Sequence, residues 1–368
     1  MSRRVVAISI GCPSGVGPEV SVLGADATRD EARAVLVGDR AVIERAAKLR
    51  GVSRSRIVPV HDEGGVRALT KKEIGWWEPS TRLPTLPEYG KPSQAEGSAQ
   101  LAWVNEATDL VTARIADALV TGPVSKAAIA SSGVPGAEDF RGHTEHLGAR
   151  LGASEVIMAF AGDALITALV TTHLAIANVP GAITREGVAA STYWLARLVG
   201  ALRKTKKKGP VIAVASLNPH AGEAGLLGHE EVDTIAPGVV LARERLSASK
   251  FAAEVVGPIG AETAIRLAAR GTYDGVLAMY HDQATIPSKL LGFGEAVNIT
   301  LGLPIVRTSV DHGTGYDVAG TGQADPRGMI EAIQAAVKLV KAGIANKPHP
   351  EADPDQRRAP PTESAVMA

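Results

Sequence analysis

The chain has 368 residues, and its 39 lysine and arginine residues are matched by 39 aspartate and glutamate residues. This zero formal charge argues against a nucleic-acid-binding or membrane-surface protein, because both need an excess of basic residues. The single cysteine, Cys12, excludes an intramolecular disulfide framework and a multi-cysteine metal site, and it is typical of a reducing compartment. No segment approaches the roughly 20 apolar residues of a membrane span. We therefore expect a cytoplasmic protein that binds neither nucleic acid nor membrane.

Short apolar runs alternate with helical patterns along the first half of the chain. Strands are expected at 4–10, 34–38, 57–60 and 118–121, and helices at 41–50 and from Gly97 onward. Residues 70–96 contain Trp76, Trp77 and four prolines, and they are expected to be irregular. A helix is expected to follow Lys126, and another to begin near Gly142.

The second half continues the alternation. Strands are expected at 164–172, at 211–217 and around Val276, and helices at 184–204, 261–270 and 326–343. The basic run at 203–208 is interpreted as a solvated helix end. Residues 346–368 are polar and rich in proline, which predicts a disordered tail.

This alternation predicts an α/β fold with largely parallel sheets, and the length suits two domains. In such folds ligands bind beyond the carboxyl ends of the strands. Five side chains follow apolar strand runs directly or shortly afterwards, namely Lys126, His173, His220, His281 and His312. We expect the active site where these strand ends meet.

Three of these side chains, His173, His220 and His281, suggest a metal site. Imidazoles from three strand ends could bind one divalent cation and leave coordination positions open for substrate or water. Each could equally be a loop histidine held by hydrogen bonds, because the local spacing of a known metal motif is absent. Spacing alone leaves both interpretations open.

Anion-binding groups form the second candidate cluster. His143 and Thr144 stand at an expected helix start, where free N–H groups attract anions, although simple capping by Thr144 would also explain them. Arg307 lies within an apolar run and is costly to bury unpaired, so it faces a bound anion or an internal salt bridge. Lys289 and Asn298 lie nearby in sequence. The turn Gly11–Glu19 is neither a GxGxxG nor a Walker loop, and a tight turn explains it.

Seven ordered motifs closely resemble the 4-hydroxythreonine-4-phosphate dehydrogenase family of vitamin B6 biosynthesis. They are TGPVSK (121–126), GHTE (142–145), TTH (171–173), LNPHAGE (217–223), YHDQ (280–283), GFGEAVNITLGLP (292–304) and RTSVDHGT (307–314). The resemblance extends from Val5 to about Gly343. One departure is Cys12, which stands where the family usually carries an acid.

The resemblance implies two α/β/α domains with a cleft between them, as in isocitrate and isopropylmalate dehydrogenases. An NAD-binding domain would comprise 1–128 and 305–345, and a metal, substrate and dimerisation domain would comprise 129–304. The implied metal ligands are His173, His220 and His281, with one supplied by the second subunit of a homodimer. The implied substrate contacts are His143, Thr144, Lys289, Asn298 and Arg307, and the implied dinucleotide contacts are His312, Gly313, Asp317 and Gly320.

The implied reaction is an NAD-dependent, metal-dependent oxidation of 4-phosphonooxy-L-threonine at its 3-hydroxyl. The resulting 3-keto acid loses CO2 to give 3-amino-2-oxopropyl phosphate. Lys126 and Asp282 are candidates for the proton acceptor, and the metal could be zinc, magnesium or cobalt, with NADP as the alternative dinucleotide. Alternative substrates are D-threonate or D-erythronate 4-phosphate and a cis-dihydrodiol dicarboxylate. A metal-dependent hydrolase or a ligand-binding protein is the alternative from another functional class.

Overall fold

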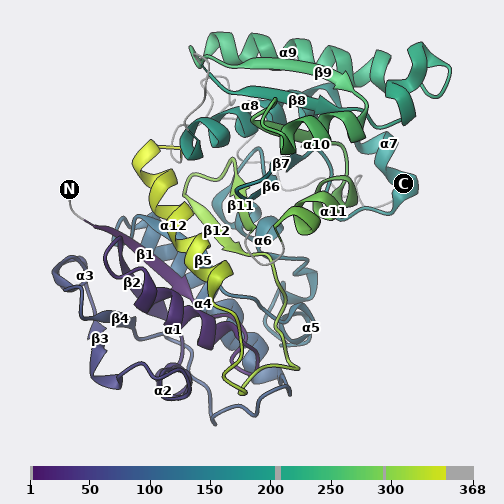
Figure 1. Ribbon diagram of the computed structural model, residues 1–368. Helices are drawn as coiled ribbons and strands as arrows, with labels where there is room; N and C mark the ends of the chain where they lie inside the picture. The colour runs from purple at the N-terminus through teal and green to yellow at the C-terminus, as the bar shows by residue number, and fades with distance from the viewer. Residues whose placement is uncertain (1–2, 204–208, 293–295, 345–368) are drawn as a thin grey trace.

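The computed structural model describes residues 3–203, 209–292 and 296–344. The predicted disordered tail and most of the basic run at 203–208 lie outside this part. The described residues form one twelve-stranded sheet in the order β3-β4-β2-β1-β5-β12-β11-β6-β7-β10-β8-β9. Figure 1 shows the strands of the N-terminal region below those of β6–β10, with α12 crossing between them. Among the described helices, none is long and apolar enough to cross a membrane.

The strands from β3 to β12 in the sheet order run parallel to one another. The expectation that residues 70–96 are irregular is wrong at Ile74–Trp77, which form β4 between β3 and β2. The elements of this region are β1 (Arg4–Ser9), α1 (Gly17–Ala27), β2 (Ala32–Val37), α2 (Arg40–Leu49), η1 (Arg54–Arg56), β3 (Ile57–Val60), α3 (Glu63–Ala68), β4, α4 (Gln94–Thr112), β5 (Ala118–Thr121), α5 (Lys126–Ala130) and η2 (Ala137–Asp139).

A second parallel group consists of β7, β10, β8 and β9. The elements from α6 onward are α6 (His143–Leu151), β6 (Ile157–Ala161), β7 (Ile166–Leu169), η3 (Ile176–Asn178), α7 (Val179–Ala182), α8 (Arg185–Leu202), β8 (Val211–Ala215), η4 (Pro219–Gly225), η5 (Glu231–Ile235), α9 (Ala236–Ala248), β9 (Glu254–Ile259), α10 (Ala261–Ala269), β10 (Gly275–Ala278), α11 (His281–Leu291), β11 (Val297–Leu301), β12 (Arg307–Val310) and α12 (Arg327–Ala342).

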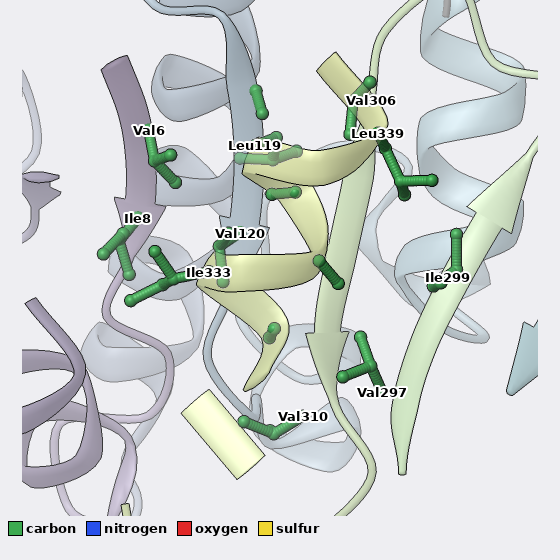
Figure 2. Close-up of a cluster of buried hydrophobic side chains, with 14 of the residues drawn as sticks. Val6, Ile8, Leu119, Val120, Val297, Ile299, Val306, Val310, Ile333 and Leu339 are labelled. Atoms are coloured by element: carbon green, nitrogen blue, oxygen red, sulfur yellow. The ribbon is translucent and has the colours of Figure 1, made fainter. Parts of the chain in front are cut away.

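Antiparallel pairing joins the two groups at the middle of the sheet. Strand β11 pairs antiparallel with both β12 and β6, and β6 pairs antiparallel with β7. Helix α12 covers one face of this junction: Figure 2 shows its Ile333 and Leu339 among apolar side chains of β1, β5, β11 and β12. The mixed α/β fold is therefore confirmed, whereas the division into 1–128 with 305–345 and 129–304 stays a prediction.

Candidate active site

Alternation along β11 and β12 turns a polar surface toward the face opposite α12. Successive side chains of a strand point to opposite faces. Val297 and Ile299 pack on the α12 side, as Figure 2 shows, so Asn298 and Thr300 point the other way. Thr300 is paired with Arg307 across the two strands. The centre of the sheet thus presents a polar patch in an otherwise apolar interior.

Arg307 is the charged centre of this patch, and it is only 3% exposed. Its Nη1 donates to Thr300 Oγ1 at 2.9 Å and its Nη2 donates to Thr121 Oγ1, at the end of β5, at 2.6 Å. Burial lowers the pKa of Arg307 to about 9, while the charge of Glu145 acts in the opposite direction. The guanidinium still carries its charge at neutral pH, and both side-chain acceptors are uncharged hydroxyls.

The first turn of α6 closes over the same patch. Thr144 Oγ1 lies 3.3 Å from Thr300 Oγ1, so Thr144 joins the hydroxyl network around Arg307. Burial, and then the nearby charge of Arg307, hold the pKa of His143 well below its ordinary value. His143 is therefore a neutral imidazole at pH 7. The four predicted substrate residues His143, Thr144, Asn298 and Arg307 are brought together from α6, β11 and β12.

Three of these four residues bury polar atoms that have no hydrogen-bond partner among the residues that the structure describes: His143 Nε2, Asn298 Oδ1 and Arg307 Nε. Buried polar atoms are nearly always paired, because an unpaired one costs about 1–3 kcal/mol. Two such atoms beside a buried cation whose own Nε is also unpaired are therefore typical of a site that is completed by a ligand.

Lys126 and Glu145 stand at the rim of the patch. The N-cap of α6 is Gly142, and a Cβ there would lie 3.0 Å from Glu145 Oε2 and 3.7 Å from Lys126 Nζ. The absence of a side chain at Gly142 thus lets the lysine and the carboxylate approach the helix start. A hydrogen bond from His173 lowers the pKa of Glu145 against the opposing effect of burial, and the charge of Lys126 adds a smaller contribution in the same direction as the hydrogen bond.

His173 and His281 meet at the ends of β7 and β10, which are neighbours in the sheet. Their ring centroids are 5.5 Å apart. The Nδ1 atom of His173 lies 3.4 Å from Glu145 Oε1, and that of His281 lies 2.7 Å from Asp282 Oδ1. A carboxylate on Nδ1 leaves Nε2 available as a metal ligand, the usual arrangement around histidine ligands. The two rings could bind a single cation.

His220, the third predicted ligand, does not join His173 and His281 in a three-residue group. It follows β8, the strand next to β10, but it lies in the segment η4. In the described part of the chain, no group of three His, Cys, Asp or Glu side chains is arranged to hold a metal ion. One chain therefore supplies two of the three predicted ligands to a common position.

The remaining predicted contacts lie on α11 and on the glycine-rich loop after β12. Lys289 is exposed near the end of α11, and its charge, with that of His281, opposes the burial that raises the pKa of Asp311. His312, Gly313 and Asp317 are exposed, and His312 Nδ1 bonds the carbonyl oxygen of Gly313 at 2.9 Å.

This loop is attached to the first strand–helix turn of the chain. Val16 N–H donates to the Thr314 carbonyl at 2.8 Å, and Gly320 N–H donates to the buried carboxylate of Glu19 at 2.8 Å. Cys12, at the position where the family usually carries an acid, lies 3.6 Å from the Tyr316 hydroxyl, and burial raises the pKa of its thiol. The turn Gly11–Glu19 is thus a structural support for the loop.

Comparison with known proteins shows to which family the chain belongs. Residues 30–336 match the model of the family described as pyridoxal phosphate biosynthetic protein PdxA. The chain belongs to the PdxA family. It is 40% identical over 354 residues to a 4-hydroxythreonine-4-phosphate dehydrogenase of Caulobacter vibrioides, covering 92% of this chain and 98% of the relative. The family resemblance, and with it the prediction of a dehydrogenase, is confirmed.

Solved structures of similar proteins share the fold. A 4-hydroxythreonine-4-phosphate dehydrogenase from Klebsiella pneumoniae matches with a TM-score of 0.76 and 30% identity, covering 92% of this chain and 99% of that one. A terephthalate 1,2-cis-dihydrodiol dehydrogenase from Burkholderia xenovorans matches with a TM-score of 0.62, also at 30% identity, over 94% and 100% of the two chains.

Four polar residues of this site were not among the predicted site residues: Thr121, Glu145, Thr300 and Asp311. Thr121 and Asp311 come at or just after the ends of β5 and β12, so the strand-end rule that selected Lys126 would also have found them. Thr300 gave no signal, because a threonine inside an apolar strand is common. Glu145 gave only the pattern of a first-turn acid.

Proposed function

We propose that this chain catalyses the dinucleotide-dependent oxidation of 4-phosphonooxy-L-threonine at its 3-hydroxyl, followed by loss of CO2 to give 3-amino-2-oxopropyl phosphate. Membership of the family supports the class of reaction, since a dehydrogenase requires a nicotinamide cofactor. The observation that carries the substrate assignment is the buried cluster of Arg307, His143 and Asn298, whose unpartnered atoms await a ligand. A small molecule with phosphate and carboxylate ends would supply the negative charge that balances the Arg307 guanidinium.

Each residue of the cluster then has a binding task. Arg307 holds one anionic end of the substrate, and Lys289 can approach the other from α11. His143, Thr144 and Asn298 donate or accept hydrogen bonds at the buried end. Because His143 is neutral in the free protein, it binds without adding a second uncompensated charge beside Arg307.

The donor set of His173 and His281 fits a divalent cation such as zinc, cobalt or magnesium. Glu145 and Asp282 orient the two rings through Nδ1. A cation held by these two rings would supply positive charge that lowers the pKa of the substrate hydroxyl and offsets the negative charge that develops during decarboxylation. His220 of the partner subunit would complete the set, because within one chain His220 does not join the pair.

Lys126 is the better of the two candidates for the proton acceptor. Its Nζ lies by the start of α6, beside the substrate cluster, where it is close to His143 and Glu145. The carboxylate of Asp282 is occupied by His281 Nδ1 and is 68% exposed, which favours an orienting task. Lys126 can accept a proton only as the neutral amine, and in that form it would take the proton of the substrate hydroxyl as the hydride leaves carbon 3.

NAD is the proposed dinucleotide, with NADP as the alternative, and the loop after β12 is its proposed site. The loop exposes His312, Gly313 and Asp317, and a Cβ on Gly313 would meet no atom within 4 Å. This open backbone lets a flat or phosphorylated ligand approach closely. The attachment to Val16 and Glu19 fixes the loop in place before the ligand arrives.

A homodimer with shared active sites is supported by exposed apolar side chains. Among the described residues, ten of the large exposed hydrophobics lie between Leu174 and Leu291, and Leu226 and Leu290 are 79% and 81% exposed. Seven of the ten, at 174–176, 226–227 and 286–291, come from segments that also carry His173, His220 and His281. Such concentrations of exposed apolar surface mark protein interfaces. We place the dimer in the cytoplasm, in keeping with the free thiol of Cys12.

A second candidate substrate is a cis-dihydrodiol dicarboxylate. The relative from Burkholderia xenovorans, whose name includes such a dihydrodiol, matches over the whole length of that chain. Its carboxylates would also satisfy Arg307. Initial rates of NADH formation with phosphohydroxythreonine, D-threonate 4-phosphate, D-erythronate 4-phosphate and the dihydrodiol separate the candidates. The proposal expects the highest kcat/KM with phosphohydroxythreonine, and a higher value with any other compound would contradict it.

A further inference from the structure

The segment that carries His220 has an unusual backbone. Five consecutive residues, from His220 to Ala224, have φ angles between 46° and 74° and ψ angles between −2° and 52°. These values describe a left-handed turn, and only one of the five residues is glycine. Four of the six non-glycine residues with positive φ in the described chain lie here. The strain is thus concentrated at one place, immediately after the end of β8.

A left-handed turn of this kind does not persist by itself. For residues with a Cβ, the left-handed helical conformation is unfavourable, because the Cβ comes too close to the following carbonyl oxygen. Strained backbone of this kind survives only where surrounding contacts over-determine it, and it is concentrated at functional sites. Neighbouring groups must therefore hold His220 and the three residues with side chains that follow it in this conformation.

Glu231 lies against this turn and holds the residues immediately before it. It is 2% exposed and begins η5, a π-helical turn that leads into α9. Its Oε1 accepts hydrogen bonds from Leu217 N–H and Asn218 N–H, both at 2.8 Å, and its Oε2 accepts one from Asn218 Nδ2 at 3.0 Å. A Cβ on Gly222 would lie 2.6 Å from Glu231 Oε2. One buried carboxylate therefore fixes the residues before the turn and packs against its middle.

Gln283 connects the segment that precedes the His220 turn to the segment that carries His281. Gln283 follows His281 by two residues, and its Nε2 donates to the Ser216 carbonyl at 2.8 Å. Its Oε1 accepts from Met279 N–H at 2.6 Å, at the end of β10. The segments after β8 and β10 are therefore joined by direct hydrogen bonds, so the position of the His220 turn is fixed relative to His281.

We propose that Glu231 is a positioning residue that holds the left-handed turn in place and so directs His220 out of its own chain toward the metal site shared with the second subunit. This inference rests on the proposed function, in which His220 is a metal ligand. Glu231 touches neither substrate nor metal. Its contacts stabilise the unfavourable backbone conformation of the turn before the metal binds.

The test is a titration of the full-length, metal-free protein with Co2+, followed by the cobalt absorption spectrum. E231A is expected to bind Co2+ roughly ten- to a hundred-fold more weakly, as is typical when outer contacts of a metal site are removed. E231Q keeps a carbonyl oxygen for the two backbone N–H groups, so it should recover most of the affinity. E244A removes an exposed carboxylate of α9 and should bind like the wild type. Wild-type affinity in E231A would overturn the proposal.

Two further measurements separate the possible failures. H220A tests the proposed function itself: if it binds Co2+ as tightly as the wild type, the ligand assignment fails. If H220A loses affinity while E231A does not, only the positioning task fails. Amide hydrogen exchange should be faster at 217–226 in E231A and unchanged in E244A. Should E231A not fold, G222A places a Cβ against the same carboxylate and is expected to weaken Co2+ binding similarly, and unchanged binding there would also refute the idea.

Discussion

Replacing Arg307 with methionine should make the ligand-free protein more stable while destroying substrate binding. Arg307 is a buried cation whose side-chain partners are two threonine hydroxyls, and its Nε has no partner in the described part of the chain. In the proposed function its charge is balanced by an anion that arrives only with the substrate. Methionine retains most of the apolar stem and removes the charge. Stability and function should therefore change in opposite directions at this position.

The magnitude follows from the pKa of Arg307. The lowering of this pKa to about 9 means that burial disfavours the charged form by roughly 5 kcal/mol. Methionine leaves Thr121 and Thr300 without their donor, at a cost of about 1 kcal/mol or more each, although Thr300 keeps its contact with Thr144. The expected net gain in the free energy of unfolding is about 1–3 kcal/mol, in line with other replacements of buried charges.

Two assays check this prediction. Thermal unfolding of the ligand-free protein should show a melting temperature a few degrees higher in Arg307→Met. Calorimetry should show phosphohydroxythreonine binding at least roughly 30-fold more weakly, the effect of losing about 2 kcal/mol or more from a buried charge pair.

Arg245 provides the control, because it is a largely covered arginine, with 13% of its side chain exposed, that donates two 2.7 Å hydrogen bonds to a carboxylate, that of Glu155. Arg245→Met should be less stable and should bind substrate normally. If Arg307→Met instead melts lower than the wild type, Arg307 is a structural cation, and the argument for a waiting anion site is wrong.

Three further predictions concern pH, the shared site and the loop. The pKa of His143 is lowered in the fold, so below about pH 6.5 the unfolded chain binds a proton that the folded chain does not. The free energy of unfolding should therefore decrease as the pH is lowered, by up to about 1.4 kcal/mol per pH unit. Urea unfolding of His143→Gln should lack this pH dependence. His173 and His281 meet within one chain, so a mixed dimer of His220→Ala and His281→Ala subunits should keep one intact metal site and regain activity. A mixed dimer of His173→Ala and His281→Ala subunits should stay inactive. The reverse result would refute the assignment of His220 to the partner. Gly320→Ala adds a Cβ 2.3 Å from an aromatic ring at a φ of +79°, so it should raise the KM for NAD with little change in kcat; an unchanged KM would separate the loop from the dinucleotide.

Much of the fold could be predicted because buried parallel strands are continuous apolar runs. Strands β3 and β5 occur at the predicted residues, and β1, β2 and β8 differ only at their ends. Strand β4 was missed because its tryptophans lie among prolines, and composition alone suggested a loop. Strand β11 interrupts its apolar pattern with Asn298 and Thr300, which serve the site and obscure the signal of a buried strand. The antiparallel junction depends on long-range pairing, which local patterns do not specify.

The site was predictable to the extent that chemistry follows strand ends. That rule, together with the motifs, selected the residues around Arg307 and the pair His173 and His281. It could not show that the third histidine stays apart within one chain, because sequence does not reveal the direction in which a loop projects. Nor could it reveal the support from Glu231, which depends on a left-handed backbone in residues that rarely adopt one.

The most direct test of the whole account is the formation of NADH from NAD+ and phosphohydroxythreonine by the purified protein with a divalent cation. We expect NADH absorbance to rise together with the release of CO2, to stop when a chelator removes the cation and to return when Zn2+ or Co2+ is restored. NADH formation that is indifferent to the chelator would contradict the metal site. Failure to oxidise this substrate at all, with no NAD binding by calorimetry, would contradict the proposed reaction itself.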